Sequence, residues 1–178
     1  MDHIAARQRL STMLEQARGA HENFYKDEAY DYELMPMYFL SQGEEKTILV
    51  AIGDMPPEAK DAIVAMVRGM ADKEQCDGYV YNSEGWTIPP EAMPLHVPGE
   101  SFSKRPDRIE ILLLEAGLRS GGHAMQKAVI HRTPGSSPRL EWDPPIFEGD
   151  EAGRITSRFN LWDPQVPKVE KFPSQARH

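Results

Sequence analysis

Two apolar runs and the loop that joins them, residues 78–115, decide the fold of this chain: they read GYVYNSEGWTIPPEAMPLHVPGESFSKRPDRIEILLLE. The first run, residues 78–82, has the aromatic and β-branched composition of a strand and leads through Ser-Glu-Gly-Trp at 83–86 into the loop. The second run, residues 109–114, is the most apolar short run in the chain. We expect both runs to be strands in the middle of a sheet, with core positions at Tyr79, Val80, Ile111 and Leu113.

Upstream of this stretch, the sequence predicts a helix and a strand hairpin. Apolar residues recur at intervals of three and four over residues 2–24, which is typical of one face of an amphipathic helix. Residues 33–40 and 46–52 are rich in strand-forming residues, and the glycine-containing segment between them has the length of a hairpin loop. Because Pro36 cannot donate a ladder hydrogen bond, we expect the first of these strands to be an edge strand or to carry a bulge there.

A second helix and further strands complete the expected elements. Residues 59–73 show helical spacing of apolar side chains after a proline-containing start. Downstream, three glycines between 117 and 122 predict a turn that pairs residues 108–115 with 124–131 as a hairpin. Further short strands are expected at 139–142 and 154–162.

These elements predict an α+β fold, a single antiparallel β-sheet of about five to seven strands with two main helices packed on one face. The length of 178 residues suits one domain, which we place at residues 1–162, followed by a proline-rich arm or tail at 163–178. With 40% apolar residues the chain has enough hydrophobic material to fold around a core.

Charge and cysteine content limit the function classes. The formal net charge of -8 makes nucleic acid an unfavourable partner. No apolar run is long enough to cross a bilayer, and the N-terminus lacks a secretory signal pattern, so we expect no membrane association and a cytoplasmic location. The single cysteine, Cys76, fits a reducing compartment and excludes an intrachain disulfide.

Candidate binding residues cluster at the two ends of the loop 88–104, which is longer than most connections in a compact domain. Such a loop is a lid, a binding or interface segment, or disordered. Trp86 has two interpretations: it lines a pocket, or it covers the end of the hydrophobic core. We favour the second. The charged residues beside it recognise an anionic group or pair with one another, and we favour pairing. The candidate binding residues are Glu84, Trp86, His96, Arg105, Asp107, Arg108 and Glu110.

Motifs of known catalytic sites are absent from the sequence, including the phosphate loop, the dinucleotide glycine fingerprint and the His-Glu-x-x-His pair. A metal site would require His96, His123 and His131 to converge with Asp107 or Glu110, and their irregular spacing disfavours this. Cys76 is interpreted as an inert thiol rather than a nucleophile. We therefore expect no cofactor and no metal, and assign no catalytic residue.

One pattern resembles that of a protein family. Ser-Glu-Gly-Trp at 83–86, a proline-containing spacer, and Arg-Pro-Asp-Arg-Ile-Glu at 105–110 are similar to a Trp…Pro-Asp-Arg-x-Glu pattern in small uncharacterised bacterial and phage proteins of α+β type. The resemblance covers the central third of the chain and implies a fold and a possible phage origin. That family has no assigned activity, so the resemblance implies no catalytic residues.

The sequence supports three hypotheses for function. The first is a non-enzymatic cytoplasmic protein that acts through protein contacts, including contacts with a second copy of itself. The second is a small-molecule-binding protein or hydrolase with its pocket between Trp86 and residues 105–110. The third, nucleic-acid binding, is disfavoured by the net charge. We favour the first, and so a role other than that of an enzyme.

Overall fold

The computed structural model describes residues 2–26, 34–44, 46–53, 56, 59–95, 97, 101–150, 157 and 159–164. Two α-helices and seven strands lie within them, which confirms the expected α+β class and strand number. In chain order the elements are α1 (His3–Phe24), β1 (Met37–Gln42), β2 (Lys46–Ala51), α2 (Lys60–Lys73), β3 (Gly78–Thr87), η2 (Pro90–Leu95), η3 (Phe102–Lys104), β4 (Ile109–Leu118), β5 (His123–His131), β6 (Arg139–Trp142) and β7 (Ile146–Phe147).

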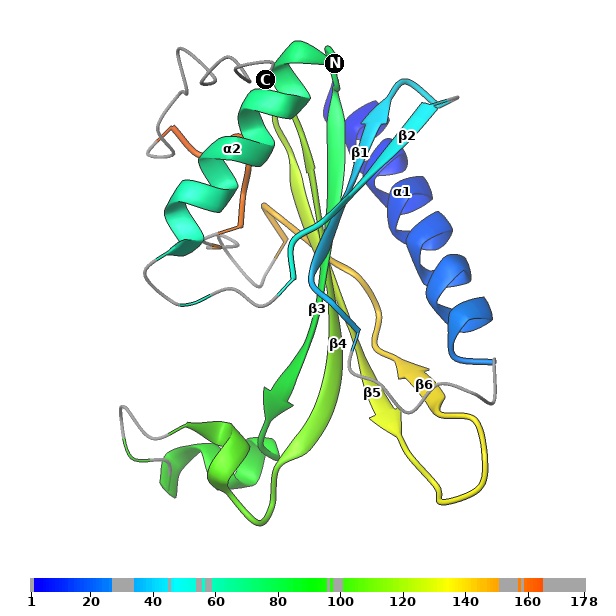
Figure 1. Cartoon of the computed structure of the whole chain (residues 1–178), viewed down its shortest axis with the longest axis vertical. Helices are drawn as coiled ribbons and strands as arrows, with labels where there is room; N and C mark the ends of the chain where they lie inside the picture. Colours follow the sequence, from blue (N-terminus) through cyan, green and yellow to red (C-terminus); the bar gives the residue numbers. More distant parts are fainter. Residues whose placement is uncertain are drawn as a thin grey trace, which may run out of the picture.

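The strands form one antiparallel sheet in the order β2-β1-β3-β4-β5-β6, with β7 paired to β5 (Figure 1). Its middle is the pair of ten-residue strands β3 and β4, which confirms the central place expected for residues 78–82 and 109–114. The expected hairpins are present as β1–β2 and β4–β5. β2 forms one edge of the sheet. β1 lies between β2 and β3 and pairs with both.

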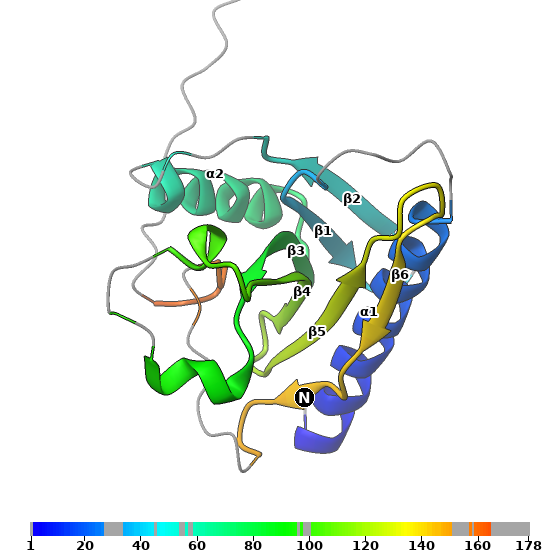
Figure 2. The same ribbon diagram turned by 90° about the horizontal axis from the view of Figure 1, so that it is seen from below.

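The two helices lie on opposite faces of the sheet, not on one face as expected (Figure 2). Val80 packs in the core beneath α1, whereas its neighbours Tyr79 and Tyr81 pack in the core beneath α2. Successive side chains of a strand point to opposite faces, so the buried run at the start of β3 needs cover on both sides.

Each helix follows from its sequence. Asp2 caps α1, its Oδ1 accepting a hydrogen bond from the Ala5 N–H at 2.7 Å. The buried stripe of α1 contains Leu10, Met13, Leu14, Ala17 and His21. α2 has no side-chain cap, and its ends carry Asp61 in the first turn and Lys73 in the last, as the helix dipole favours. Among the described helices, none has the length and apolarity to cross a bilayer.

Several strand boundaries differ from the sequence predictions. β1 is an interior strand and begins at Met37, so Pro36 lies just before it. The Pro36 carbonyl still accepts a hydrogen bond from the Ile52 N–H at 2.9 Å. The missing N–H of Pro36 therefore falls outside the strand and requires no bulge. Residues 83–86 continue β3 instead of leaving the sheet, because β4 is long enough to pair with them. Within the expected strand 154–162, the described residues 157 and 159–162 form turns and irregular structure.

The core positions of β4 also differ from expectation. Leu112 and Leu114 are fully buried beneath α1, while Ile111 and Leu113 are only partly buried on the α2 side. α2 packs on β1 and on the first residues of β3, at Tyr79 and Tyr81. It therefore does not reach Ile111 and Leu113, which pair with the last part of β3. Tyr79 and Val80 are buried as expected. Of the expected C-terminal arm, residues 165–178 lie outside the described residues.

A close approach between β3 and β4 explains one glycine. Gly117 stands directly opposite Tyr79, and a Cβ at Gly117 would lie 2.5 Å from the tyrosine ring. The ring therefore occupies the space that any side chain at position 117 would need. This places the Tyr79 hydroxyl in a buried polar cluster described below.

Candidate functional site

The structure brings together Glu84 and Glu110, two of the residues predicted for a site, on the α1 side of the sheet. Arg132, just after β5, binds Glu110 with two nitrogens (Nη2–Oε1 2.7 Å, Nε–Oε2 3.0 Å) and lies 3.5 Å from Glu84 Oε2. The Tyr25 hydroxyl donates a hydrogen bond to Glu84 Oε1. The Glu84 side chain is only 6% exposed, so its charge depends on these partners.

Trp86 and the basic residues at the far end of the loop are also engaged within the chain. The Arg108 guanidinium lies 4.6 Å from the centroid of the Trp86 ring, and its Nη1 donates to the Ser103 carbonyl. Arg105 holds Asp107 with two hydrogen bonds of 2.9 and 2.8 Å, which lower the pKa of the Asp107 carboxyl. These charged side chains are thus engaged by groups of the same chain, which is the interpretation favoured from the sequence.

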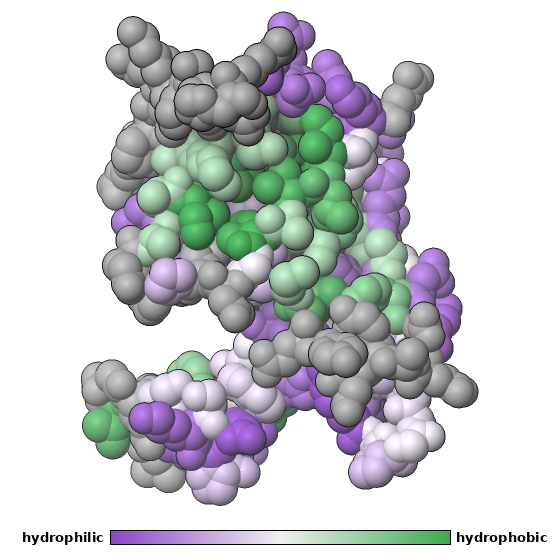
Figure 3. Space-filling model, in the orientation of Figure 1, coloured by the Kyte–Doolittle hydropathy of each residue, from purple (hydrophilic) through white to green (hydrophobic). Residues whose placement is uncertain are grey.

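The loop that separates these residues contains η2 and η3 and extends from the far end of β3 and β4 (Figure 1). The space-filling view shows a hollow between this loop and the body of the molecule (Figure 3). Ile88, at the start of the loop, is buried, so the loop is anchored at the sheet. His96 lies outside the described residues.

The remaining histidines do not meet at the loop. His123 binds Glu115 (2.9 Å) in the interior, and His131 binds Glu141 (3.0 Å) at the surface. The described residues contain no group of three or more His, Cys, Asp or Glu side chains placed to hold a metal ion. The thiol of Cys76 is buried, and burial raises its pKa, which disfavours the reactive thiolate.

Sequence reasoning missed a buried polar cluster on the α2 side. Glu115 is 1% exposed and accepts a hydrogen bond from the Tyr79 hydroxyl at 3.0 Å, besides its contact with His123. The Ser157 hydroxyl donates to the other Glu115 oxygen, and Asn160 Oδ1 accepts from Tyr79 at 3.3 Å. Tyr79, Glu115 and His123 are buried, and Ser157 and Asn160 are partly buried, so the cluster joins the sheet to the described residues 157 and 159–164.

Arg132 and Tyr25 were likewise missed as partners of Glu84. Arg132 comes from the end of β5 and Tyr25 from the end of α1. Their meeting with Glu84 depends on strand order and on the helix crossing the sheet. Neither residue stands in a motif, so no local signal in the sequence could have identified them.

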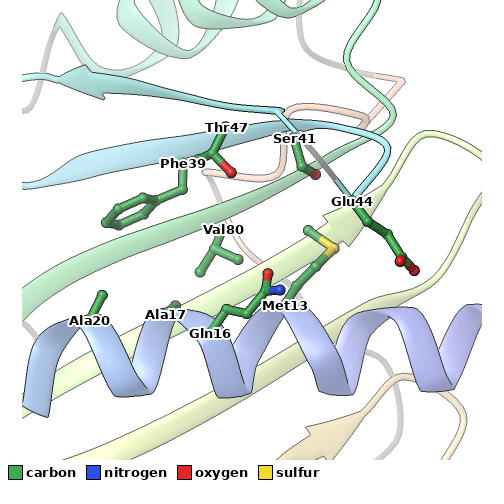
Figure 4. Close-up of a pocket in the computed structure, with 9 residues that line it drawn as sticks. All are labelled: Met13, Gln16, Ala17, Ala20, Phe39, Ser41, Glu44, Thr47 and Val80. Carbon is green, nitrogen blue, oxygen red and sulfur yellow. The ribbon is translucent and has the colours of Figure 1, made fainter.

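A pocket of about 290 Å³ lies on the α1 side, between the helix and the overhanging strands β1 and β2 (Figure 4). α1 packs mainly on β4 and β5, so it leaves this part of the sheet uncovered. Met13, Ala17 and Ala20 form the helical wall, and the sheet supplies Phe39, Ser41, Thr47 and Val80. The Ser41 hydroxyl is buried without a hydrogen-bond partner. Gln16 on the helix and Glu44 beyond β1 complete the lining, so the pocket has a mixed lining with an apolar majority and one unsatisfied hydroxyl.

The pocket adjoins β2, which pairs with no strand on its outer side among the described residues. The Ile52 N–H bonds to Pro36 on β1, and hydrogen-bonded pairs alternate along an antiparallel ladder. Thr47, Leu49 and Ala51 must therefore direct their backbone N–H and C=O groups away from β1, toward the open edge. Leu49 is 57% exposed on the same face as the pocket. The edge thus combines free backbone groups with an exposed apolar side chain.

Among the described residues, the side chains predicted for a binding site are thus engaged by contacts within the chain. The pocket contains apolar surface and the unsatisfied Ser41 hydroxyl. A scan against protein-family models, a search of curated proteins and a search of solved structures found no significant match to this chain.

Proposed function

We propose that this protein acts by contact with another polypeptide rather than by catalysis, and that the contact surface is the open edge of β2. The observation that carries the proposal is the set of outward-facing backbone groups at Thr47, Leu49 and Ala51. An added strand would satisfy these groups with main-chain hydrogen bonds, which is how sheet edges bind extended segments. The adjoining pocket would supply selectivity through side chains.

The contrast between the two edges of the sheet supports this proposal. β6, at the opposite edge, has four residues, carries the ion pair Arg139–Glu141 and is followed by Pro144 and Pro145. Short strands, charges and prolines are devices that prevent pairing at an edge. The six-residue strand β2 has none of these along its outward positions. Lys46, its one charged residue, forms an ion pair with Glu74 of the same chain.

The surface around β2 is also unusually apolar. In Figure 3, hydrophobic residues gather over the part of the molecule that β2 and α2 occupy in the same view. Leu49 on β2 and Met66 on α2 are among the exposed large hydrophobic residues. Leu49 lies on the α1 face and Met66 on the helix that covers the other face, so an exposed large apolar side chain lies near β2 on each side of the sheet. Exposed apolar side chains beside a strand edge favour a protein contact there. The buried, unpaired Cys76 suits a cytoplasmic setting for that contact.

A photo-crosslinking amino acid at position 49 would test this function in cells that make the protein at its natural level. We expect covalent adducts with a polypeptide at position 49 and few at position 141, an exposed matched position on β6. Ala51→Pro should reduce the adducts, because proline blocks strand addition at an outward position without removing a ladder bond. Equal yields at positions 49 and 141 would overturn the proposal.

A further inference from the structure

Two residues of β2 on the same face of the sheet differ in their surroundings: one side chain projects into solvent, and the other, two positions earlier, lines the pocket. Leu49 projects from the α1 face of β2, and Thr47 lines the pocket on that face. Leu49 is not among the residues that line the pocket of its own chain, and its side chain is 57% exposed. A second β2 strand in the correct register would bring another Leu49 to Thr47.

We propose that the partner is a second copy of this chain, bound by antiparallel pairing of the two β2 strands about a two-fold axis at Ile48. This inference rests on the proposed function and names the partner. In that register Thr47 stands opposite Leu49 of the partner subunit, and Leu49 stands opposite the partner's Thr47. Each Leu49 side chain then enters the pocket of the other copy, as an isologous interface requires.

Backbone geometry selects this register. An axis perpendicular to the sheet keeps the α1 faces of the two copies on the same side, which Leu49 needs in order to reach the pocket. It also pairs outward-facing residues with outward-facing residues, so Thr47 and the partner's Leu49 exchange both N–H···O=C bonds. The symmetry repeats these two bonds between Leu49 and the partner's Thr47, so the two residue pairs form four backbone hydrogen bonds between the strands.

The side chains are compatible with this arrangement. On the α2 face, Ile48 would meet the partner's Ile48, and both are partly buried apolar residues already. Lys46 would stand opposite the partner's Val50, and its ammonium group is held by Glu74 of its own chain at 3.5 Å. No like charges therefore oppose one another along the paired strands, despite the net charge of -8.

The pocket itself matches the incoming group. Its interior is lined by neutral side chains, and Glu44, the one charged lining residue, is exposed. A neutral aliphatic side chain is therefore favoured over an anionic one, which would have no cation among the lining residues. Burying a leucine side chain at each of the two symmetric sites stabilises an interface by a factor of about ten or more per site.

Register-specific cross-linking tests the proposal. In Ile48→Cys the two introduced thiols would face each other as a pair that is not hydrogen-bonded, with Cα atoms about 4.5 Å apart, within the range for a disulfide. In Leu49→Cys the corresponding Cα atoms would be about 8 Å apart, beyond that range. We expect mild oxidation to give a disulfide-linked dimer with Ile48→Cys and little with Leu49→Cys or with the wild type, whose Cys76 is buried.

Sedimentation of the unmodified protein and of pocket variants provides a second readout. Ala20→Trp fills the pocket from an exposed helix position, and we expect it to weaken dimerisation about tenfold or more. Ala5→Trp, an exposed position on the same helix away from the pocket, is the matched control and should not change the dimer.

The outcomes separate the inference from the function on which it rests. A monomer at the highest soluble concentration, or stronger cross-linking at 49 than at 48, overturns the proposed dimer. If the adducts formed in cells at position 49 then join a different protein, the proposed function stands with another partner. If the adducts are also absent there, both proposals fall.

Discussion

The Tyr25 hydroxyl donates a hydrogen bond to the Glu84 carboxylate and so ties the end of α1 to the middle of β3. The carboxylate sits in a nearly solvent-free environment. Burial raises the pKa of Glu84 above its ordinary value of 4.5, although Tyr25, the Leu34 N–H and Arg132 act in the opposite direction. The link between helix and sheet is therefore sensitive to pH.

We predict that Glu84→Gln changes how stability depends on pH. The folded state holds the Glu84 proton more tightly than the unfolded state, so this carboxyl contributes stability below pH 4.5 that is lost as the pH rises through its folded-state pKa. The free energy of unfolding of the variant, relative to wild type, should therefore rise from acid to neutral pH. Urea unfolding at a series of pH values measures this. Glu91→Gln, in the exposed η2, is the control, and a difference that does not vary with pH would contradict the prediction.

His21 is predicted to make the protein sensitive to acid. It lies on the buried face of α1, its Nε2 has no hydrogen-bond partner, and burial lowers its pKa from 6.5 to about 4. Stability that the neutral ring contributes above pH 6.5 is lost as the pH falls toward the folded-state pKa, by up to about 3 kcal/mol. His21→Leu should reduce this loss, measured by chemical unfolding across that range. Gln8→Leu, at an exposed position that carries no titratable group on the same helix, should leave the acid sensitivity unchanged.

Gly117→Ala is predicted to destabilise the protein by about 1–3 kcal/mol. The added methyl would lie 2.5 Å from the Tyr79 ring, which is fully buried and hydrogen-bonded. Gly85→Ala, on β3, is the matched control because a Cβ at that position would have no neighbour within 4 Å. Thermal or urea unfolding of both variants measures the effect. Equal stability of the two variants would show that the ring moves aside without cost.

Asn160→Ala is predicted to loosen residues 157–164 while leaving the sheet intact. Asn160 Oδ1 accepts hydrogen bonds from the Tyr79 hydroxyl and, at 2.9 Å, from the Trp162 N–H. Losing them should speed amide hydrogen exchange in this segment by roughly five- to tenfold, as expected for about 1 kcal/mol per hydrogen bond. Asn23→Ala, an exposed position, is the control. Faster exchange throughout β3 and β4 would instead mean that the segment supports the whole fold.

Local patterns in the sequence were sufficient to predict most of the elements. Helical spacing identified α1 and α2, and glycine-containing turns identified the two hairpins, because these features depend on neighbours within a few residues. The two-residue strand β7 was missed, since a run that short has no periodicity. The continuation of β3 through Gly85 and Trp86 was missed because strand length is set by pairing with β4, which lies far along the chain.

The sidedness of the sheet and the contents of the site depend on tertiary structure. Tyr79 and Val80 were both expected in the core, but only strand order shows that they face different helices. Glu84 and Glu110 were singled out from the sequence, whereas Arg132 comes from a strand two positions away in the sheet from β3. The pocket beneath β2 could not be predicted, because it results from where α1 crosses the sheet.

The buried cluster at Glu115 has a consequence for the order of folding. All seven described strands precede Ser157 and Asn160 in the chain, so a sheet that forms first holds Glu115 and Tyr79 without these two partners. The same later segment supplies Phe159, whose ring stacks on Tyr81 with centroids 4.2 Å apart. We therefore expect the part of the α2 face around Tyr79 and Tyr81 to stay exposed during folding until the later segment docks, and chaperones that bind exposed aromatic surface to recognise the chain at that stage.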